Sequence, residues 1–244
     1  MQIENGGFMG FISLPVIIFL YWLMLHYKKD APFPKWGVLL LMLAGAVSAL
    51  LAALLYNPLI SVASLIYGTE SAKPSFQWNL LSMFLTAGLI EEGLKYLSCR
   101  IAISKKGMTN TWMDCVIAFA TAGITFQLIE NMSYGMSSGP AGAIARAVAP
   151  GHFVFGVIMG YYYGKFRVSG QKKHLVLCYA VPVVIHTIFD VFLQSADLGK
   201  AYLYMAAAAA LIFFATAVIT VVKVIHWQKN NALDIPVNTA QKVL

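Results

Sequence analysis

Seven long apolar segments, joined by short connections that hold most of the charge, dominate the sequence of this chain. A helix needs about 20 mostly apolar residues to cross the roughly 30 Å hydrocarbon core of a bilayer. Only 11% of the 244 residues are charged, whereas soluble domains carry about 25%. The sequence therefore predicts an all-α, polytopic bundle of about seven transmembrane helices in a single integral-membrane domain, 1–244. The predicted spans are 8–27, 36–56, 78–99, 112–131, 141–163, 175–194 and 201–226.

The second segment is followed by Asn57 and Pro58, and then by a further apolar stretch that ends at Tyr67. This stretch is short for a span. We expect it to lie at the membrane interface or to re-enter the membrane without crossing it. The pattern leaves the role of 57–68 open.

The basic residues are arranged asymmetrically about these segments. Thirteen of the 17 Lys and Arg residues fall in alternate connections and at the C-terminal end. Because cytosolic loops are enriched in Lys and Arg, this pattern predicts an N-terminus outside and a C-terminus in the cytosol. The net charge of +7 could otherwise suggest nucleic acid. Short basic clusters between apolar runs argue against that partner and for the lipid bilayer.

Ionisable residues inside spans three to six bear most directly on function. A charge at the bilayer centre costs about 2.5–3.5 kcal/mol on insertion scales, so such residues face a protein interior and mark function. Spans one, two and seven have none near their centres, which predicts a functional four-helix core at about 78–194. The candidate functional residues inside its spans are Glu91, Glu92, Lys95, Glu130, Arg146, His152, His186 and Asp190.

Span three carries two adjacent glutamates and a lysine. Glu91 and Lys95 are four residues apart, so they lie on one helix face and are predicted to pair. Glu92 points about 100° away. Two neighbouring carboxylates in a low dielectric cannot easily both ionise, so one is suited to accept a proton and the other to donate one. A Glu–Lys pair that merely holds helices together would leave Glu92 without a role.

Span four ends with Phe126 and Glu130, which share a helix face, and then Asn131. Glu130 lies toward the outer end of the span, and Arg146 enters span five from that same side. Two interpretations stay open. Glu130 and Arg146 could form an ion pair, or Glu130 could help to bind a substrate.

Histidines in spans five and six lie at a similar depth. His152 begins a row of glycines that is typical of close helix packing, so it should face a neighbouring helix near mid-bilayer. His186 and Asp190 share one face of span six, and a carboxylate one turn from an imidazole can fix its tautomer and raise its basicity. A lone histidine would be a packing residue, but two at the level of the glutamates indicate a catalytic site. The glycines of the row are Gly156, Gly160 and Gly164.

In their order along the chain, these residues resemble the motifs of the PrsW family of intramembrane proteases. That family lies within the wider group of membrane-embedded CAAX-type prenyl endopeptidases. The resemblance covers about 78–194, and each motif falls on its own predicted span. The motifs EExxK, FxxxEN, HxxxG and HxxxD correspond to Glu91-Glu92-x-x-Lys95, Phe126-x-x-x-Glu130-Asn131, His152-x-x-x-Gly156 and His186-x-x-x-Asp190.

The resemblance implies an enzyme of the bacterial plasma membrane that cleaves a peptide bond in or beside a membrane segment. PrsW-like proteins act as site-1 proteases on membrane-anchored anti-sigma factors, which implies such a partner and a cut in the outer half of the bilayer. One of Glu91 and Glu92 would activate a water. His152 and His186 would hold that water or stabilise the oxyanion, with Asp190 orienting His186. The other residues would bind substrate or support the site: Lys95, Phe126, Glu130, Asn131 and Arg146.

Two mechanisms fit these residues. In a glutamic mechanism a glutamate is the general base and no metal takes part. In a metal mechanism His152, His186 and a carboxylate, such as that of Asp190, bind Zn²⁺. Glu91 or Glu92 would then be the base. The sequence has no HExxH pair and would need ligands from separate helices, so the glutamic mechanism is favoured and no cofactor is expected.

A proton-coupled membrane transporter is the main alternative from another class, since buried Glu, Asp and His residues also serve as proton relays. The usual signs of such a transporter, interrupted helices in corresponding halves of an inverted repeat, are not evident in the sequence. A haem protein with His152 and His186 as axial ligands would leave the glutamates unexplained.

Overall fold

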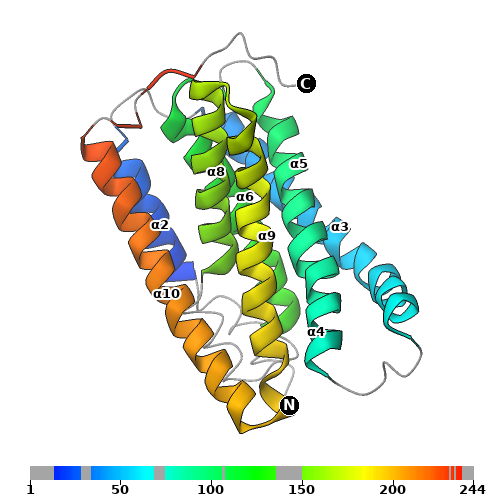
Figure 1. Cartoon of the computed structure of the whole chain (residues 1–244). Coiled ribbons are helices and arrows are strands. Elements are labelled where there is room, and N and C mark those ends of the chain that lie inside the picture. The colour runs from blue at the N-terminus through cyan, green and yellow to red at the C-terminus, as the bar shows by residue number, and fades with distance from the viewer. Residues whose placement is uncertain are drawn as a thin grey trace, which may run out of the picture.

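The computed structural model describes residues 14–28, 34–68, 75–105, 108–135, 150–230, 232–233 and 235–237. Within these ranges the helices form seven rods, with no strand beyond an isolated bridge between Thr111 and Pro236 (Figure 1). The third rod is divided into α4, η2 and α5, and η3 is a short 3₁₀ turn. The elements are α2 (Leu14–His26), α3 (Lys35–Tyr67), α4 (Phe76–Met83), η2 (Phe84–Glu91), α5 (Glu92–Ile103), α6 (Trp112–Gly135), α8 (Gly151–Ser169), α9 (Lys172–Gln194), η3 (Ala196–Leu198) and α10 (Lys200–Lys229).

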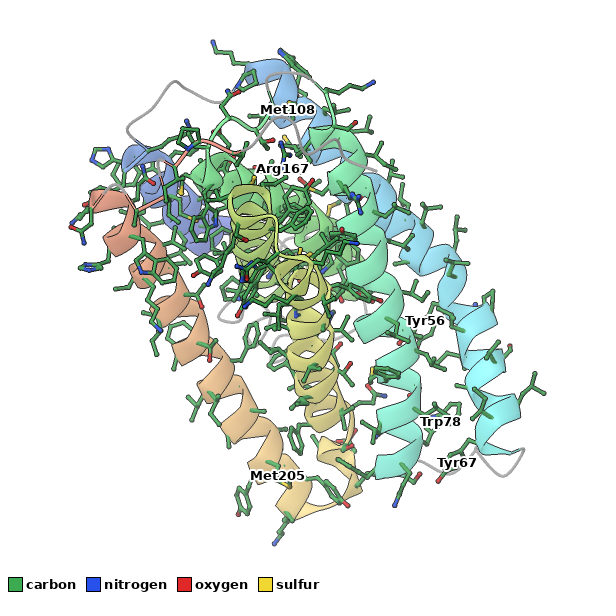
Figure 2. The ribbon with its side chains drawn as sticks, turned by 45° about the horizontal axis from the view of Figure 1, so that its top comes forward. Tyr56, Tyr67, Trp78, Met108, Arg167 and Met205 are labelled. Carbon is green, nitrogen blue, oxygen red and sulfur yellow. The ribbon has the colours of Figure 1, made fainter. Side chains whose placement is uncertain are left out.

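Four of the described helices are long and apolar enough to cross a membrane: α3, α6, α9 with the turn that follows it, and α10. Large apolar and aromatic side chains cover their outward faces. Tyr56 and Tyr67 on α3 and Met205 on α10, which are labelled in Figure 2, are each more than 40% exposed. The all-α, membrane-spanning fold class is therefore confirmed. The direction in which the chain crosses the membrane stays a prediction.

The apolar stretch after Pro58 continues α3 instead of forming a separate segment. Proline usually breaks a helix because it has no N–H and its ring clashes with the preceding turn. Here helical geometry resumes at once, and the hydroxyl of Ser61 donates to the carbonyl of Asn57. The result is one helix of 33 residues, about 50 Å long at 1.5 Å per residue. The expectation that 57–68 re-enters the membrane separately is wrong.

The pair α6 and α8 lies at the centre of the bundle (Figure 1). The glycine row of α8 makes this close approach. A Cβ on Gly156 or Gly160 would overlap backbone atoms of α6, and one on Gly164 would overlap the Trp112 ring. Gly123 of α6 makes the reciprocal contact with the carbonyl of His152. The predicted close-packing face is confirmed, and small side chains are its physical cause.

The fifth rod begins later than predicted. The sequence places this span at 141–163, but α8 starts at Gly151, directly after Pro150. Proline suits a helix start because its missing N–H would have no partner in the first turn. His152 therefore lies in the first turn of α8, and its depth near mid-bilayer stays a prediction. Arg146 lies outside the described residues.

The segment after α10 returns to the start of α6 and covers that end of the bundle. The carbonyls of Ile235 and Leu233 accept the N–H groups of Trp112 and Met113, each at 3.1 Å. These are first-turn donors that have no partner within their own helix. Leu233 and Val237 are buried there. The C-terminal segment therefore supplies both caps and core to α6.

Candidate active site

Five of the predicted polar residues converge where the third rod, α6, α8 and α9 meet. Glu92 is completely buried, and its Oε1 accepts hydrogen bonds from Lys95 Nζ at 2.5 Å and from His186 Nδ1 at 2.7 Å. His186 Nε2 lies 3.2 Å from Asp190 Oδ2. His152 lies beside them, with its ring centre 5.0 Å from that of His186. The predicted contact between Asp190 and His186 is thus present.

Lys95 pairs with Glu92 and not, as the four-residue spacing suggests, with Glu91. Both glutamates lie within one turn of the lysine, and helical pairs form at spacings of three as well as four. Burial decides between them. Glu92 has no exposed side-chain surface, whereas Glu91 keeps 18%. A fully buried carboxylate must be compensated, so the ammonium group goes to Glu92.

His152 has a protein partner at each ring nitrogen. Its Nδ1 lies 2.6 Å from Lys95 Nζ, and its Nε2 lies 2.5 Å from Glu130 Oε2. An ammonium group can only donate. Nδ1 therefore accepts, and Nε2 carries the proton and donates it to Glu130. The Phe126 ring packs 4.5 Å from the His152 ring centre and 4.5 Å below Lys95 Nζ, which holds both side chains in place.

This contact makes Glu130 the hydrogen-bond partner of His152. The sequence left open an ion pair with Arg146 or substrate binding, and the family resemblance implied that Glu130 binds substrate or supports the site. Arg146 lies outside the part of the chain that the structure describes. Asn131, the next residue, is buried. Nearby, Gln127 Oε1 accepts the N–H of Phe153 at 3.4 Å and ties α6 to the first turn of α8.

Glu91 and Glu92 each have a buried Oε2 without a hydrogen-bond partner among the described residues. They differ in what surrounds them: Glu92 Oε1 accepts from Lys95 and His186, whereas Glu91 Oε2 lies 4.0 Å from His152 Nε2. That distance is too long for a direct hydrogen bond and suits a bridging oxygen. Ligand atoms of Glu91, His152 and His186 all lie within 4.8 Å of one another. The carboxylate grouped with the two histidines is therefore Glu91 and not Asp190, which lies one turn further along α9.

The π-helical segment η2, which ends at Glu91, was not predicted from the sequence. Its Leu89 carbonyl accepts a hydrogen bond of 2.8 Å from the hydroxyl of Tyr179 on α9. A Cβ on Gly88 would overlap the Thr187 hydroxyl, so η2 and α9 are in close contact. Glycines at 88 and 93, on either side of the glutamates, are the only sequence sign of this irregularity.

Comparison with known proteins agrees with the motifs. The family described as "PrsW family intramembrane metalloprotease" matches residues 33–221, well beyond the 78–194 of the motif resemblance. "Protease PrsW" of Clostridioides difficile is 28% identical over 193 residues, which cover 74% of this chain and 76% of that protein. "Protease PrsW" of Bacillus subtilis is 34% identical over 117 residues, 46% of this chain and 54% of that protein. No solved structure matches.

Proposed function

Because this chain belongs to the PrsW family of intramembrane proteases, we propose that it hydrolyses a peptide bond in or beside the membrane segment of a membrane-anchored protein, with Glu91 activating the water. Membership also makes it a multi-pass protein of the bacterial plasma membrane. One observation carries the proposal. The buried Oε2 of Glu91 has no hydrogen-bond partner among the described residues and faces the imidazole of His152.

Glu91 is the suitable base because its Oε2 faces His152 and Lys95 is paired with Glu92 instead. A water between this oxygen and His152 could lose a proton to the carboxylate as it attacks the peptide carbonyl. The bond to the leaving nitrogen would then break, and Glu91 would return the proton to that nitrogen. Glu92 is unsuited to this step, since its Oε1 already accepts hydrogen bonds from Lys95 and His186. Its role is to hold these two side chains.

His152 is suited to stabilise the oxyanion of the tetrahedral intermediate. Its Nε2 lies 4.0 Å from Glu91 Oε2, and its N–H would turn from Glu130 to the oxyanion as the charge develops. His152 also lies in the first turn of α8, where the positive end of the helix dipole favours a developing negative charge.

The family description implies a metal ion, and the donor set fits one. Glu91, His152 and His186 would hold it, and two histidines with one glutamate are a known set for catalytic zinc. A bound ion would supply Lewis-acid activation of water. Glu92, which accepts from Nδ1 of His186, would be the outer carboxylate that such histidines usually have. His152, however, has its Nε2–H directed at Glu130, so we favour Glu91 as a base without metal.

The substrate follows from the family resemblance and remains a proposal. We propose a membrane-anchored anti-sigma factor that is cut on the outer side of the bilayer. The distribution of basic residues supports this orientation, because it predicts that Lys172 and Lys173 at the start of α9 face the cytosol. His186 and Asp190 lie toward the opposite end of that helix.

The test is cleavage of a membrane-anchored reporter in proteoliposomes. Glu91→Gln should reduce the rate at least about 10³-fold while the protein still inserts and folds, because the amide cannot accept the proton. Full activity of this variant would refute the assignment. Metal content and activity in a chelator decide the second question: stoichiometric zinc whose removal abolishes cleavage would overturn the metal-free mechanism. Comparing membrane-bound fragments in cells with active or Glu91→Gln protein would identify the substrate.

A further inference from the structure

The segment that carries Glu91 is a π-helix, not an α-helix. η2 spans eight residues, Phe84–Glu91, and regular α-helix resumes at Glu92. Such segments make up well under 1% of residues in proteins and occur often at functional sites. They widen the turn, so every residue after them is rotated relative to a continuous α-helix. The direction in which the glutamates point therefore depends on η2 keeping this geometry.

A side chain from another helix holds the end of η2. The Tyr179 hydroxyl donates to the Leu89 carbonyl at 2.8 Å, two residues before Glu91. At the end of a π-helix the backbone donors are displaced from their α-helical partners, and in a membrane a carbonyl without a donor is costly. The Leu89 carbonyl accepts the N–H of Glu92, only three residues ahead, as well as the hydroxyl. Tyr179 thus supplies a donor where the helix is irregular.

Close packing of η2 against α9 brings the Tyr179 hydroxyl within hydrogen-bond distance of the Leu89 carbonyl. Gly88 has no side chain to keep η2 away from Thr187, and its Cβ position lies against the Thr187 hydroxyl and the Val183 carbonyl. Tyr179 itself is only part-buried and lines an apolar cavity of about 420 Å³ between α5 and α9. Its hydroxyl can therefore be removed without opening a hole in a closed core.

We propose that Tyr179 is a positioning residue for the reaction: its hydrogen bond to the Leu89 carbonyl maintains η2 and so aims the Glu91 carboxylate at His152. The inference rests on the proposed function of Glu91. Without the hydroxyl, η2 relaxes toward α-helical pairing, and a shift of one residue turns a side chain by about 100°. Substrate binding should not depend on this bond, because the Tyr179 hydroxyl contacts the η2 backbone, whereas Glu130 contacts His152.

The test compares Tyr179→Phe with a matched control, Tyr96→Phe. Tyr96 lines the same cavity, and its ring centre lies 6.4 Å from that of Tyr179, but its hydroxyl accepts from Arg100 at 3.0 Å and does not touch η2. For Tyr179→Phe we expect kcat to fall about fivefold, which corresponds to a lost hydrogen bond of about 1 kcal/mol. KM should stay unchanged, and the melting temperature should fall by no more than about 2–4 °C. Tyr96→Phe should keep wild-type kcat.

Hydrogen–deuterium exchange of the segment 84–95 gives a second readout that does not depend on activity. Exchange there should accelerate in Tyr179→Phe and not in Tyr96→Phe, because only the first loosens η2. Equal kcat and equal exchange in the two variants would overturn the inference, as would a fall in kcat that only follows a fall in melting temperature. Failure of the proposed function is distinguishable: Glu91→Gln would then be active, whatever the exchange of 84–95 shows.

Discussion

Replacing Lys95 with methionine should destabilise the folded protein by about 3–5 kcal/mol, because the change leaves a buried charge without its counter-charge. Glu92 is completely buried, and Lys95 Nζ and His186 Nδ1 both donate to its Oε1. Without the lysine, only His186 would compensate this carboxylate, whose Oε2 already has no hydrogen-bond partner in the described part of the chain. Methionine keeps most of the packing against Phe126, so the fall in the free energy of unfolding measures the effect of removing the positive charge.

A double-mutant cycle separates the pair from its surroundings. Glu92→Gln removes the other charge and keeps the shape, so it should also be costly alone, since it leaves Lys95 buried and unpaired. In the double variant neither charge remains. Its loss should therefore be about 1–3 kcal/mol smaller than the sum of the two single losses. The assay is the free energy of unfolding by denaturant titration in mild detergent, followed by tryptophan fluorescence.

Two results would refute this reasoning. Strictly additive losses would mean that Lys95 and Glu92 are not coupled. A loss below about 1 kcal/mol for Lys95→Met would mean that the pair behaves like one on an exposed surface. Lys223→Met is the matched control, because Lys223 is exposed on α10, and such a substitution should change stability by less than about 0.5 kcal/mol.

Two further predictions concern the architecture. Gly160→Ala should lower the free energy of unfolding by about 1–3 kcal/mol, because the added Cβ would overlap the backbone at Val116. Gly151→Ala is the control and should lower it much less, since a Cβ there meets only ordinary contacts. Equal melting temperatures of the two variants would contradict this packing. Deleting 232–244 should lower the free energy of unfolding by about 3–6 kcal/mol at most, because Leu233 and Val237 are buried. Deleting only 238–244 leaves both residues in place, so this shorter truncation should have the higher melting temperature.

Much of the fold could be predicted because it depends on local composition. The apolar runs predict the rods, and the glycine row of α8 predicts its packing face, since helical periodicity carries both signals. The errors occurred at helix ends and at proline. Pro58 lies inside α3, and Pro150 begins α8 ten residues later than expected. In each case the same residue type is compatible with more than one backbone geometry, and the surrounding packing selects one. The four-helix catalytic core at 78–194 stays a prediction.

The sequence by itself determined which side chains are available for chemistry, because a charged residue in an apolar run must face the protein interior. Glu91, His152 and His186 could be selected in this way. Only the tertiary structure decided their partners: Lys95 and His186 donate to Glu92, whereas Glu91 Oε2 lies 4.0 Å from His152 Nε2. Spacing along one helix cannot predict this outcome, because it depends on the burial of each carboxylate and on contacts between helices. The contact of Tyr179 with η2 is of the same kind, since it joins residues 90 positions apart.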